Sequence, residues 1–341
     1  MTTVPSRPLQ SSVAIEDVTS LKERSFGQRL LSSQPFWVTV ALLIICVVMA
    51  WDQPEAFATA DNFYNITRNF AFIGIMAVGM TAVILTGGID LSVGSIMGLV
   101  GVVCGLVLHA EHYWAVAIAA GLLAGAAAGA VNGFLIAYVG LPAFVVTLGM
   151  LSVARSLAVV LSENRMIYEF GPWGETFNAI GGGSILGVAN PAWALLVLAL
   201  IFGFIFNFTA WGNYLYAIGS NETAARLTGV PVRRIKMQAY IVSGLTAALA
   251  SVLTVGWQGS AINALGQGYE LRVIASTVIG GADLMGGQGG AYGAVVGAAL
   301  IEVIRNSLLM AGVDANWQGA FVGLFIVLAV LLQRIRGKRS A

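Results

Sequence analysis

Repeated apolar runs of about twenty residues are the feature that most restricts how this chain can fold. A helix needs about 20 mainly apolar residues to cross the hydrocarbon core of a bilayer. Only 10% of the 341 residues are charged, whereas 58% are hydrophobic. A soluble domain carries about 25% charged residues, so this chain has too little polar surface to cover a water-soluble globule. The sequence therefore predicts an all-α membrane protein whose surface is covered by the lipid bilayer.

The apolar runs predict a polytopic bundle of about ten transmembrane helices. We expect residues 1–35 to form an N-terminal tail, residues 36–335 a single transmembrane domain, and residues 336–341 a short C-terminal tail. The expected spans are residues 36–52, 69–87, 91–109, 114–138, 142–162, 190–208, 238–257, 270–281, 290–311 and 317–333.

Basic residues lie mainly outside these spans, in the two tails and in the loop 209–237. Positively charged residues mark cytoplasmic loops. Ten spans return the chain to its starting side, and six of them precede the loop. Both termini and the loop are therefore predicted to be cytoplasmic. The net charge of +1 gives no sign of a nucleic-acid partner.

One short pattern occurs twice. TGGIDLSVGS at 86–95 and IGGADLMGG at 279–287 share Gly-Gly-x-Asp-Leu-x-x-Gly, which puts Asp90 and Asp283 at matching positions. Transporters are often built from internal repeats and have Gly-interrupted helices at the binding site. We therefore expect discontinuous helices at these two places.

Polar residues inside the spans are candidates for a translocation path, because a carboxylate at membrane depth is costly and tends to be functional or paired. The alternative is structural: each aspartate caps a helix at the membrane edge, and Asn132 bonds to a neighbouring helix. Glu302 and Arg305 are three residues apart and are expected to pair with each other. The candidates for the path are Asp90, Ser92, Asn132, Thr147 and Asp283.

Glycines in the fourth span indicate close helix packing. Gly121, Gly125, Gly129 and Gly133 recur every four residues and make a smooth stripe along one helix face. Small residues let two helix backbones approach closely in lipid. We expect this helix to lie inside a tight bundle.

The loop 209–237 contains a short predicted helix. Asn221 is a good N-cap, and Glu222 suits the positive end of the helix. Gly229 then ends it, and Pro231 prevents its continuation. Such a stiff element suits the transmission of force from a soluble partner. The residues expected to form this coupling element are Asn221, Glu222, Ala224, Ala225, Gly229 and Pro231.

At these motifs the chain resembles the ribose-type permeases of bacterial ABC sugar importers, the branched-chain amino acid/ribose permease family. The resemblance covers roughly residues 36–335. It rests on TGGIDLSVGS at 86–95, AIGSNETAARLTGVPV at 217–232, VIASTVIGGADLMGGQGGAYGAVVGA at 273–298, and GLPAFVVTLGM at 140–150.

The resemblance implies a fold like that of type II ABC importers and a place in the bacterial inner membrane. The segment from Glu222 to Gly229 looks like the Glu-Ala-Ala coupling motif of ABC permeases, with Thr223 where that motif has Ala. The implied partners are a cytoplasmic ABC ATPase, a periplasmic sugar-binding protein and a second permease copy or homologue. The implied mechanism is alternating access.

The sequence itself gives no sign of catalysis. It contains no Gly-x-x-x-x-Gly-Lys-Ser/Thr phosphate loop, and its two histidines, His109 and His112, do not form a His-Glu-x-x-His zinc site. We therefore expect no catalytic, cofactor or metal site on this chain, with ATP and Mg²⁺ bound by the partner ATPase. The alternatives are an ion-coupled secondary transporter, an ABC permease for an amino acid, and a membrane-embedded enzyme.

Overall fold

Helices make up most of the chain that the computed structural model describes, namely residues 31–314, 317, 319–320 and 323–324. The chain divides into two units, Met1–Ser33 and Gln34–Ala341, and the fold below is that of the second unit. Its elements are α3 (Gln34–Asp52), α4 (Pro54–Phe57), α5 (Ala60–Leu85), α6 (Val93–His109), α7 (Trp114–Phe134), η1 (Leu135–Val139), α8 (Ala143–Leu161), η2 (Gly171–Trp173), α9 (Gly174–Gly182), β1 (Ser184–Ile185), β2 (Val188–Ala189), α10 (Asn190–Phe208), α11 (Ala210–Ser220), α12 (Glu222–Leu227), α13 (Val232–Gln258), α14 (Tyr269–Ile279) and α15 (Ala291–Met310).

Seven helices of the described part are long and apolar enough to cross a membrane: α3, α5, α7 with its continuation η1, α8, α10, α13 and α15. The predicted all-α membrane bundle is confirmed. The count of ten is not, because α6 has 17 residues and α14 only 11. The tenth expected span, 317–333, and the two predicted tails fall almost entirely outside the described residues.

The eighth expected span, 270–281, is too short to cross a bilayer by itself. Eleven helical residues rise about 16 Å, against about 30 Å of hydrocarbon. The preceding segment 259–268 is not helical, because Gly259, Gly266 and Gly268 take positive φ angles of 63°, 74° and 78°. Helix α6 likewise begins only after the non-helical segment 86–92. The breaks predicted at the two glycine pairs are present at 86–92, between α5 and α6, and at 280–290, between α14 and α15. The break at 259–268 was not predicted.

An arginine on α8 links the segment 259–268 to the start of α6. The Arg155 guanidinium donates to the Asn263 and Leu265 carbonyls in segment 259–268, and to the Gly94 carbonyl in the first turn of α6. A non-helical backbone at membrane depth is tolerated only where protein or water satisfies its polar groups. Arg155 therefore holds the two discontinuous helices together.

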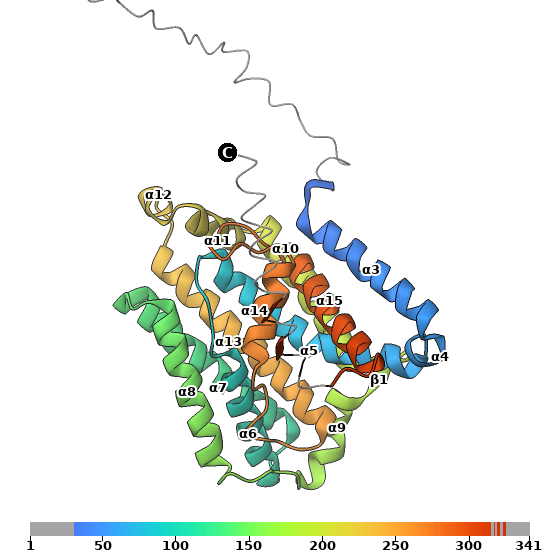
Figure 1. Ribbon diagram of the computed structural model, residues 1–341. Helices are drawn as coiled ribbons and strands as arrows, with labels where there is room; N and C mark the ends of the chain where they lie inside the picture. Colours follow the sequence, from blue (N-terminus) through green and yellow to red (C-terminus); the bar gives the residue numbers. More distant parts are fainter. Residues whose placement is uncertain (1–30, 315–316, 318, 321–322, 325–341) are drawn as a thin grey trace, which may run out of the picture. The chain divides into compact units, whose positions relative to one another are not determined.

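The centre of the bundle is formed by α5, α6 and α13, and the outside by α3, α8 and α10 (Figure 1). From Ala71 to Leu85, every residue of α5 is buried. A helix that is apolar on all sides belongs in the interior. The outer helices instead expose large apolar side chains, among them Leu43, Val47, Val145, Val160, Leu200 and Phe204.

The glycine stripe of α7 packs directly on the backbone of α13, which confirms the predicted close approach, but the other faces of α7 are mostly not buried. A Cβ atom added at Gly125 would lie 2.5 Å from the Gly244 carbonyl oxygen, and one at Gly129 would lie 2.3 Å from that of Tyr240. One at Gly133 would lie 2.8 Å from the Met237 Cα atom. These distances leave no room for any side chain, so the stripe fixes how closely α7 and α13 approach.

We predict that Gly125→Ala lowers the stability of the protein by about 1–3 kcal/mol, because α7 and α13 must move apart to fit the methyl group. Gly149→Ala on α8 is the matched control, since nothing lies within 4 Å of a Cβ atom built there. The melting temperature of each variant in detergent measures the effect. Equal melting temperatures for both variants would contradict this account of the stripe.

Candidate functional site

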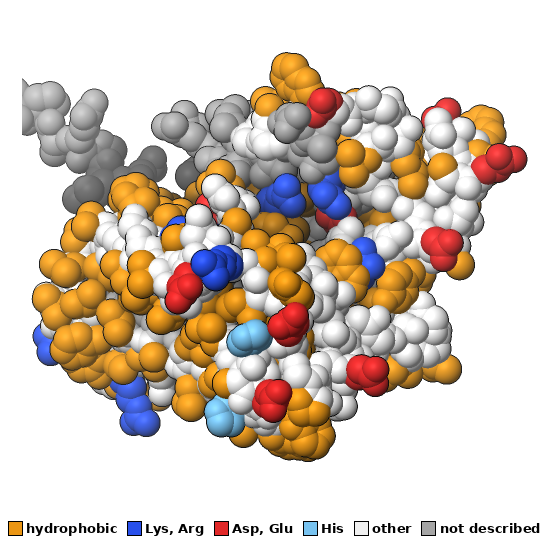
Figure 2. Space-filling model, turned by 90° about the horizontal axis from the view of Figure 1, so that it is seen from below, with side chains coloured by type: hydrophobic (Ala, Val, Ile, Leu, Met, Phe, Trp, Pro, Cys, Tyr) orange, Lys and Arg blue, Asp and Glu red, His pale blue; other side chains and the backbone are white. Residues whose placement is uncertain are grey.

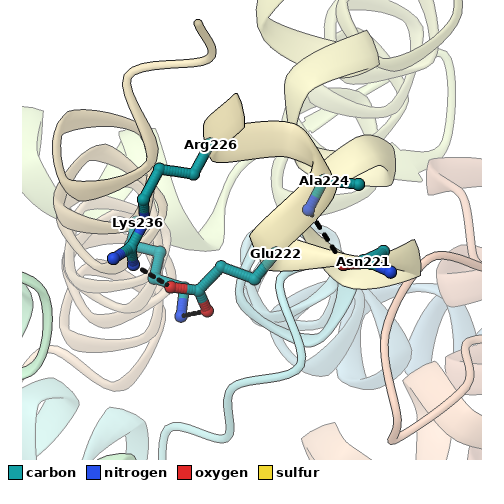
Figure 3. Close-up of polar contacts among 5 residues, drawn as sticks. All are labelled: Asn221, Glu222, Ala224, Arg226 and Lys236. Atoms are coloured by element: carbon teal, nitrogen blue, oxygen red, sulfur yellow. Dashed lines mark hydrogen bonds and ion pairs between the residues drawn. The ribbon is translucent and has the colours of Figure 1, made fainter. Parts of the chain in front are cut away.

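The predicted short helix is present as α12, and Asn221 caps it. Asn221 has an extended backbone, and its side-chain oxygen accepts a hydrogen bond from the Ala224 amide at 2.9 Å. Such a cap satisfies an amide that has no partner within the helix. Figure 3 shows this contact at the turn where α12 begins.

Glu222 fastens α12 to the next long helix. One carboxylate oxygen accepts from Arg226 at 2.8 Å within α12, and the other accepts from Lys236 of α13 at 2.6 Å (Figure 3). The hydrogen bond from Lys236, with Arg226 adding to it, holds the pKa of Glu222 below its ordinary value. Because the folded pKa is lowered, the ion pairs are intact at neutral pH and are lost only as the pH falls through that lowered value.

Gly229 follows the end of α12 as predicted, whereas α13 begins at Val232, six residues before the expected span 238–257. Gly229 has a left-handed φ of 87°, and the chain folds back so that the Val230 amide donates to the Ala225 carbonyl. A residue with a Cβ atom would be strained at Gly229 by roughly 1–2 kcal/mol. Pro231 then precedes the first turn of α13.

The two alanines of α12 do not share one face. Ala224 is exposed, but Ala225 is 5% exposed and packs into the protein. Leu227, which the sequence analysis did not single out, is 84% exposed at the end of α12. The free face of α12 therefore presents Thr223, Ala224 and Leu227. The sequence did contain a signal for Leu227, since it is an apolar residue at the end of an otherwise polar loop.

Asp90, Ser92 and Asn132 come together in one buried network. One Asp90 oxygen accepts from the Ser92 amide at 3.0 Å and from its hydroxyl group, and the other accepts from Ser243 of α13 at 2.8 Å. Asn132 of α7 donates to the Ser92 hydroxyl at 2.9 Å. All four side chains are fully buried. Ser243 was missed because no local motif links it to Asp90, 153 residues away.

Thr147 and Asp283 lie outside this network. Thr147 donates mainly to the Ala143 carbonyl of its own helix, with a longer contact of 3.4 Å to the Ile89 carbonyl. Asp283 accepts from the Met285 amide two residues on, as Asp90 does from Ser92. The two motifs thus share a local turn, but Asp283 is partly exposed.

The two Gly-Gly-x-Asp segments meet each other beside α11. The Gly287 amide donates to the Leu85 carbonyl at 3.0 Å. A Cβ atom at Gly219 of α11 would lie 1.9 Å from that carbonyl oxygen and 2.2 Å from the Gly287 nitrogen. The Tyr216 hydroxyl of α11 donates to the Gly289 carbonyl at 2.9 Å. We call the contact of Leu85, Gly219 and Gly287 the glycine junction.

The glycine junction connects α12 with Asp90. Helix α11 runs into α12 through Ser220 and Asn221, and Asp90 follows the junction on the other side. A Cβ atom at Gly88 would lie 2.5 Å from the Tyr240 hydroxyl, so this stretch also packs on α13. The arrangement places a surface helix, two helix breaks and a buried carboxylate in continuous contact.

The family described as branched-chain amino acid transport system / permease component matches residues 62–330, which is more than half of the chain. The chain belongs to this family. It is a permease subunit, and such a subunit is not itself an enzyme. Among the residues that the structure describes, no group of three His, Cys, Asp or Glu side chains is placed to hold a metal ion.

Individual relatives of this permease match it over most of their length. The Escherichia coli K12 ribose import permease protein RbsC is 38% identical over 294 residues, 86% of this chain and 91% of the relative. The D-allose transport system permease protein AlsC of the same strain is 34% identical over 94% of this chain and 99% of its own. The L-arabinose ABC transporter permease protein AraH of Azospirillum brasilense is 34% identical over 88% of this chain and 87% of its own. No solved structure matches significantly.

The two matched aspartates should differ sharply in what they contribute. Asp90→Asn places an amide where three donors converge, so we predict a loss of about 1–3 kcal/mol in stability from the buried polar mismatch. Asp283→Asn keeps an acceptor for the Met285 amide in a partly exposed turn, and we predict almost no change. Thermal unfolding in detergent compares them. Equal destabilisation would contradict the difference drawn here between the two environments.

Proposed function

We propose that this permease is the membrane subunit of an ATP-driven, binding-protein-dependent ABC importer that carries a monosaccharide across the bacterial inner membrane. The single observation that carries the proposal is α12, a capped surface helix fastened to α13 and joined through α11 to the breaks that precede α6 and α15. The named relatives act on ribose, allose and arabinose, which supports a sugar as the solute.

In this proposal α12 docks on a cytoplasmic ATPase that binds ATP and Mg²⁺. When the ATPase closes, α12 moves, and two contacts pass the movement on. The Glu222–Lys236 ion pair pulls on α13, and the glycine junction displaces the segments that follow Leu85 and precede α15. Access to the path then alternates between the two sides. The permease itself makes and breaks no covalent bond.

The same proposal sets the topology. The end of the bundle that carries α12 is cytoplasmic, and the opposite end, with α9 and the β1–β2 hairpin, faces a periplasmic sugar-binding protein (Figure 1). Both termini are proposed to be cytoplasmic, in agreement with the basic residues of the tails. A second permease copy or homologue is proposed to complete the complex.

The proposed role of Asp90, Ser92 and Asn132 is to brace the start of α6 beside the path rather than to contact the solute. Their partners are Ser243 and each other, and all are fully buried. This arrangement also weakens the ion-coupled alternative, since the network links Asp90 to the coupling helix through the glycine junction. Thr147 and Asp283 are assigned no contact with the solute.

Docking of the ATPase should depend on Leu227. We predict that Leu227→Glu abolishes both sugar uptake and co-purification of the ATPase, because a charge replaces the apolar contact on the free face of α12. The matched control for co-purification is Leu186→Glu in the β1–β2 hairpin, which should retain the ATPase, since Leu186 is 89% exposed at the opposite end and Leu227 is 84% exposed. Retention of the ATPase by Leu227→Glu would remove α12 from the docking surface.

Uptake in proteoliposomes tests the function as a whole. The permease is reconstituted with the ATPase and binding protein with which it assembles, and labelled ribose, arabinose, allose and a branched-chain amino acid are compared. We expect uptake of one of the sugars that requires both ATP and the binding protein. Uptake driven by a proton or sodium gradient without the ATPase would overturn the proposal, and ATP-dependent uptake of the amino acid alone would correct the solute.

A further inference from the structure

A second polar cluster lies where α14 begins, and within the described part of the chain none of its residues forms a hydrogen bond or ion pair with α12. It joins the first half of α5, the end of α13, the start of α14 and the middle of α15. We call it the arginine–glutamate cluster, and its members are Arg68, Asn69, Trp257, Tyr269, Arg272, Glu302 and Arg305.

Glu302 has a carboxylate oxygen with no partner. Its side chain is only 2% exposed, and one oxygen accepts from Arg305 Nε at 3.0 Å. The other oxygen, Oε1, is buried without a hydrogen-bond partner. The Asn69 side chain of α5 lies within reach of this carboxylate, and Arg272 of α14 is close enough to act on its charge. An unpaired buried oxygen costs free energy, so its retention needs a reason beyond the ion pair with Arg305.

Arg68 presents a second unused group on the same cluster. Its guanidinium lies over the Trp257 ring, 4.0 Å from the ring centre, and 5.5 Å from that of Tyr64. Its Nε atom is buried without a hydrogen-bond partner. A cation over an aromatic face is held in a fixed plane. A free donor and a free acceptor therefore belong to one cluster, with aromatic faces beside them.

The cluster sits at a helix start and is reachable from outside. Gly268, with φ 78°, precedes α14, an 11-residue helix whose first residue, Tyr269, lies against Arg272. Transporters place such half-helix starts at their solute sites. The Arg305 side chain is 28% exposed. Figure 2 shows basic side chains around a depression on the face opposite α12.

The chemistry of the cluster selects the kind of solute. Three arginines against one carboxylate disfavour a cation, and a simple anion brings no donor for Glu302 Oε1. An uncharged polyol supplies what both free groups lack, since its hydroxyl groups donate to Glu302 Oε1 and accept from the arginines. The rings of Trp257 and Tyr269 offer flat apolar faces to the C–H groups of a sugar ring.

We propose that the arginine–glutamate cluster is the site where the permease contacts the monosaccharide after the binding protein releases it. This site rests on the proposed function and names where the solute touches this chain. It replaces Asp90 and its neighbours as the contact site, and it assigns Glu302 a role beyond the pair with Arg305. The solute-binding groups are Glu302, Arg68 and Trp257.

Uptake by variants of the full complex tests the site. At saturating binding protein, we expect Glu302→Gln and Trp257→Leu each to lower sugar uptake at least tenfold, while ATP hydrolysis stays within twofold of wild type. Trp257→Phe keeps an aromatic face and should retain at least half of the uptake. Asp61→Asn, an exposed change on the same helix as Arg68, is the control. Uptake within twofold of wild type for Glu302→Gln would overturn the site.

Cysteine labelling tests the same site without altering Glu302. In a Cys46→Ser, Cys104→Ala background, Asn69→Cys should react with a membrane-impermeant thiol reagent added from the binding-protein side. We expect sugar-loaded binding protein to slow that reaction at least fivefold during turnover, and sugar-free binding protein to leave it unchanged. Asp61→Cys should react without protection. Labelling of Asn69→Cys that sugar does not slow would overturn the site.

The wild-type complex separates failure of this site from failure of the proposed function. If wild type shows no ATP-dependent uptake of ribose, arabinose or allose, the proposed function fails. If wild type transports a sugar, both variants transport it at the wild-type rate, and the sugar does not slow the labelling of Asn69→Cys, only the site fails. Stronger protection by a sugar acid such as gluconate than by a neutral sugar would overturn the polyol assignment.

Discussion

The need to satisfy every backbone polar group inside a bilayer governs this structure. The chain leaves helical geometry at 86–92 and at 259–268, and each break is stabilised by groups from elsewhere. Arg155 donates to two carbonyls in 259–268 and to the Gly94 carbonyl in the first turn of α6, and Ser243 donates to Asp90 in 86–92. These breaks are possible only in the interior, where α5 and α13 surround them. The glycine stripe of α7 contributes to this packing, because it lets α13 lie close to α7.

Two buried polar clusters lie inside this bundle, and they differ in how their carboxylates are bonded and in their access to the surface. The Asp90 network bonds every oxygen of its carboxylate to a donor of the chain, which suits a fixed support for the start of α6. Glu302 keeps one oxygen without a partner, and Arg68 keeps one donor. In a low-dielectric interior, satisfied networks rigidify and unsatisfied groups are costly. The Asp90 network is not fully satisfied either, because Asn132 Oδ1 and the neighbouring Tyr240 hydroxyl are buried without a partner. The two clusters differ in access: the Arg305 side chain is 28% exposed and Trp257 is 37% exposed, whereas the side chains of the Asp90 network are fully buried. This difference in access is the basis for assigning support to one cluster and contact with the solute to the other.

Local patterns predicted local structure well. The Asn221 cap, the Gly229 turn and the α7 stripe each depend on neighbours within a few residues or on one helix face. Such features can be read directly from the amino-acid sequence. The environments of Asp90 and Asp283 do not follow from their shared motif, because Ser243 lies 153 residues from Asp90. Lys236, Arg68 and Trp257 were missed for the same reason: their partners come from other helices. The expected bounds 270–281 nearly match α14, but the non-helical segment before it was missed because hydropathy does not report the positive φ angles at Gly266 and Gly268.

The glycine junction has a mechanical consequence. Most contacts between helices run through side chains, whose χ angles absorb small displacements by changing rotamer. At Gly219 there is no side chain, and backbone touches backbone at Leu85 and Gly287. Such a contact contains no side-chain torsion angle that could rotate to absorb a displacement. A small displacement of α11, of a size that a side-chain rotation would absorb elsewhere, is therefore transmitted across the junction. Even a small movement of α12 at the surface then displaces the segments in the interior.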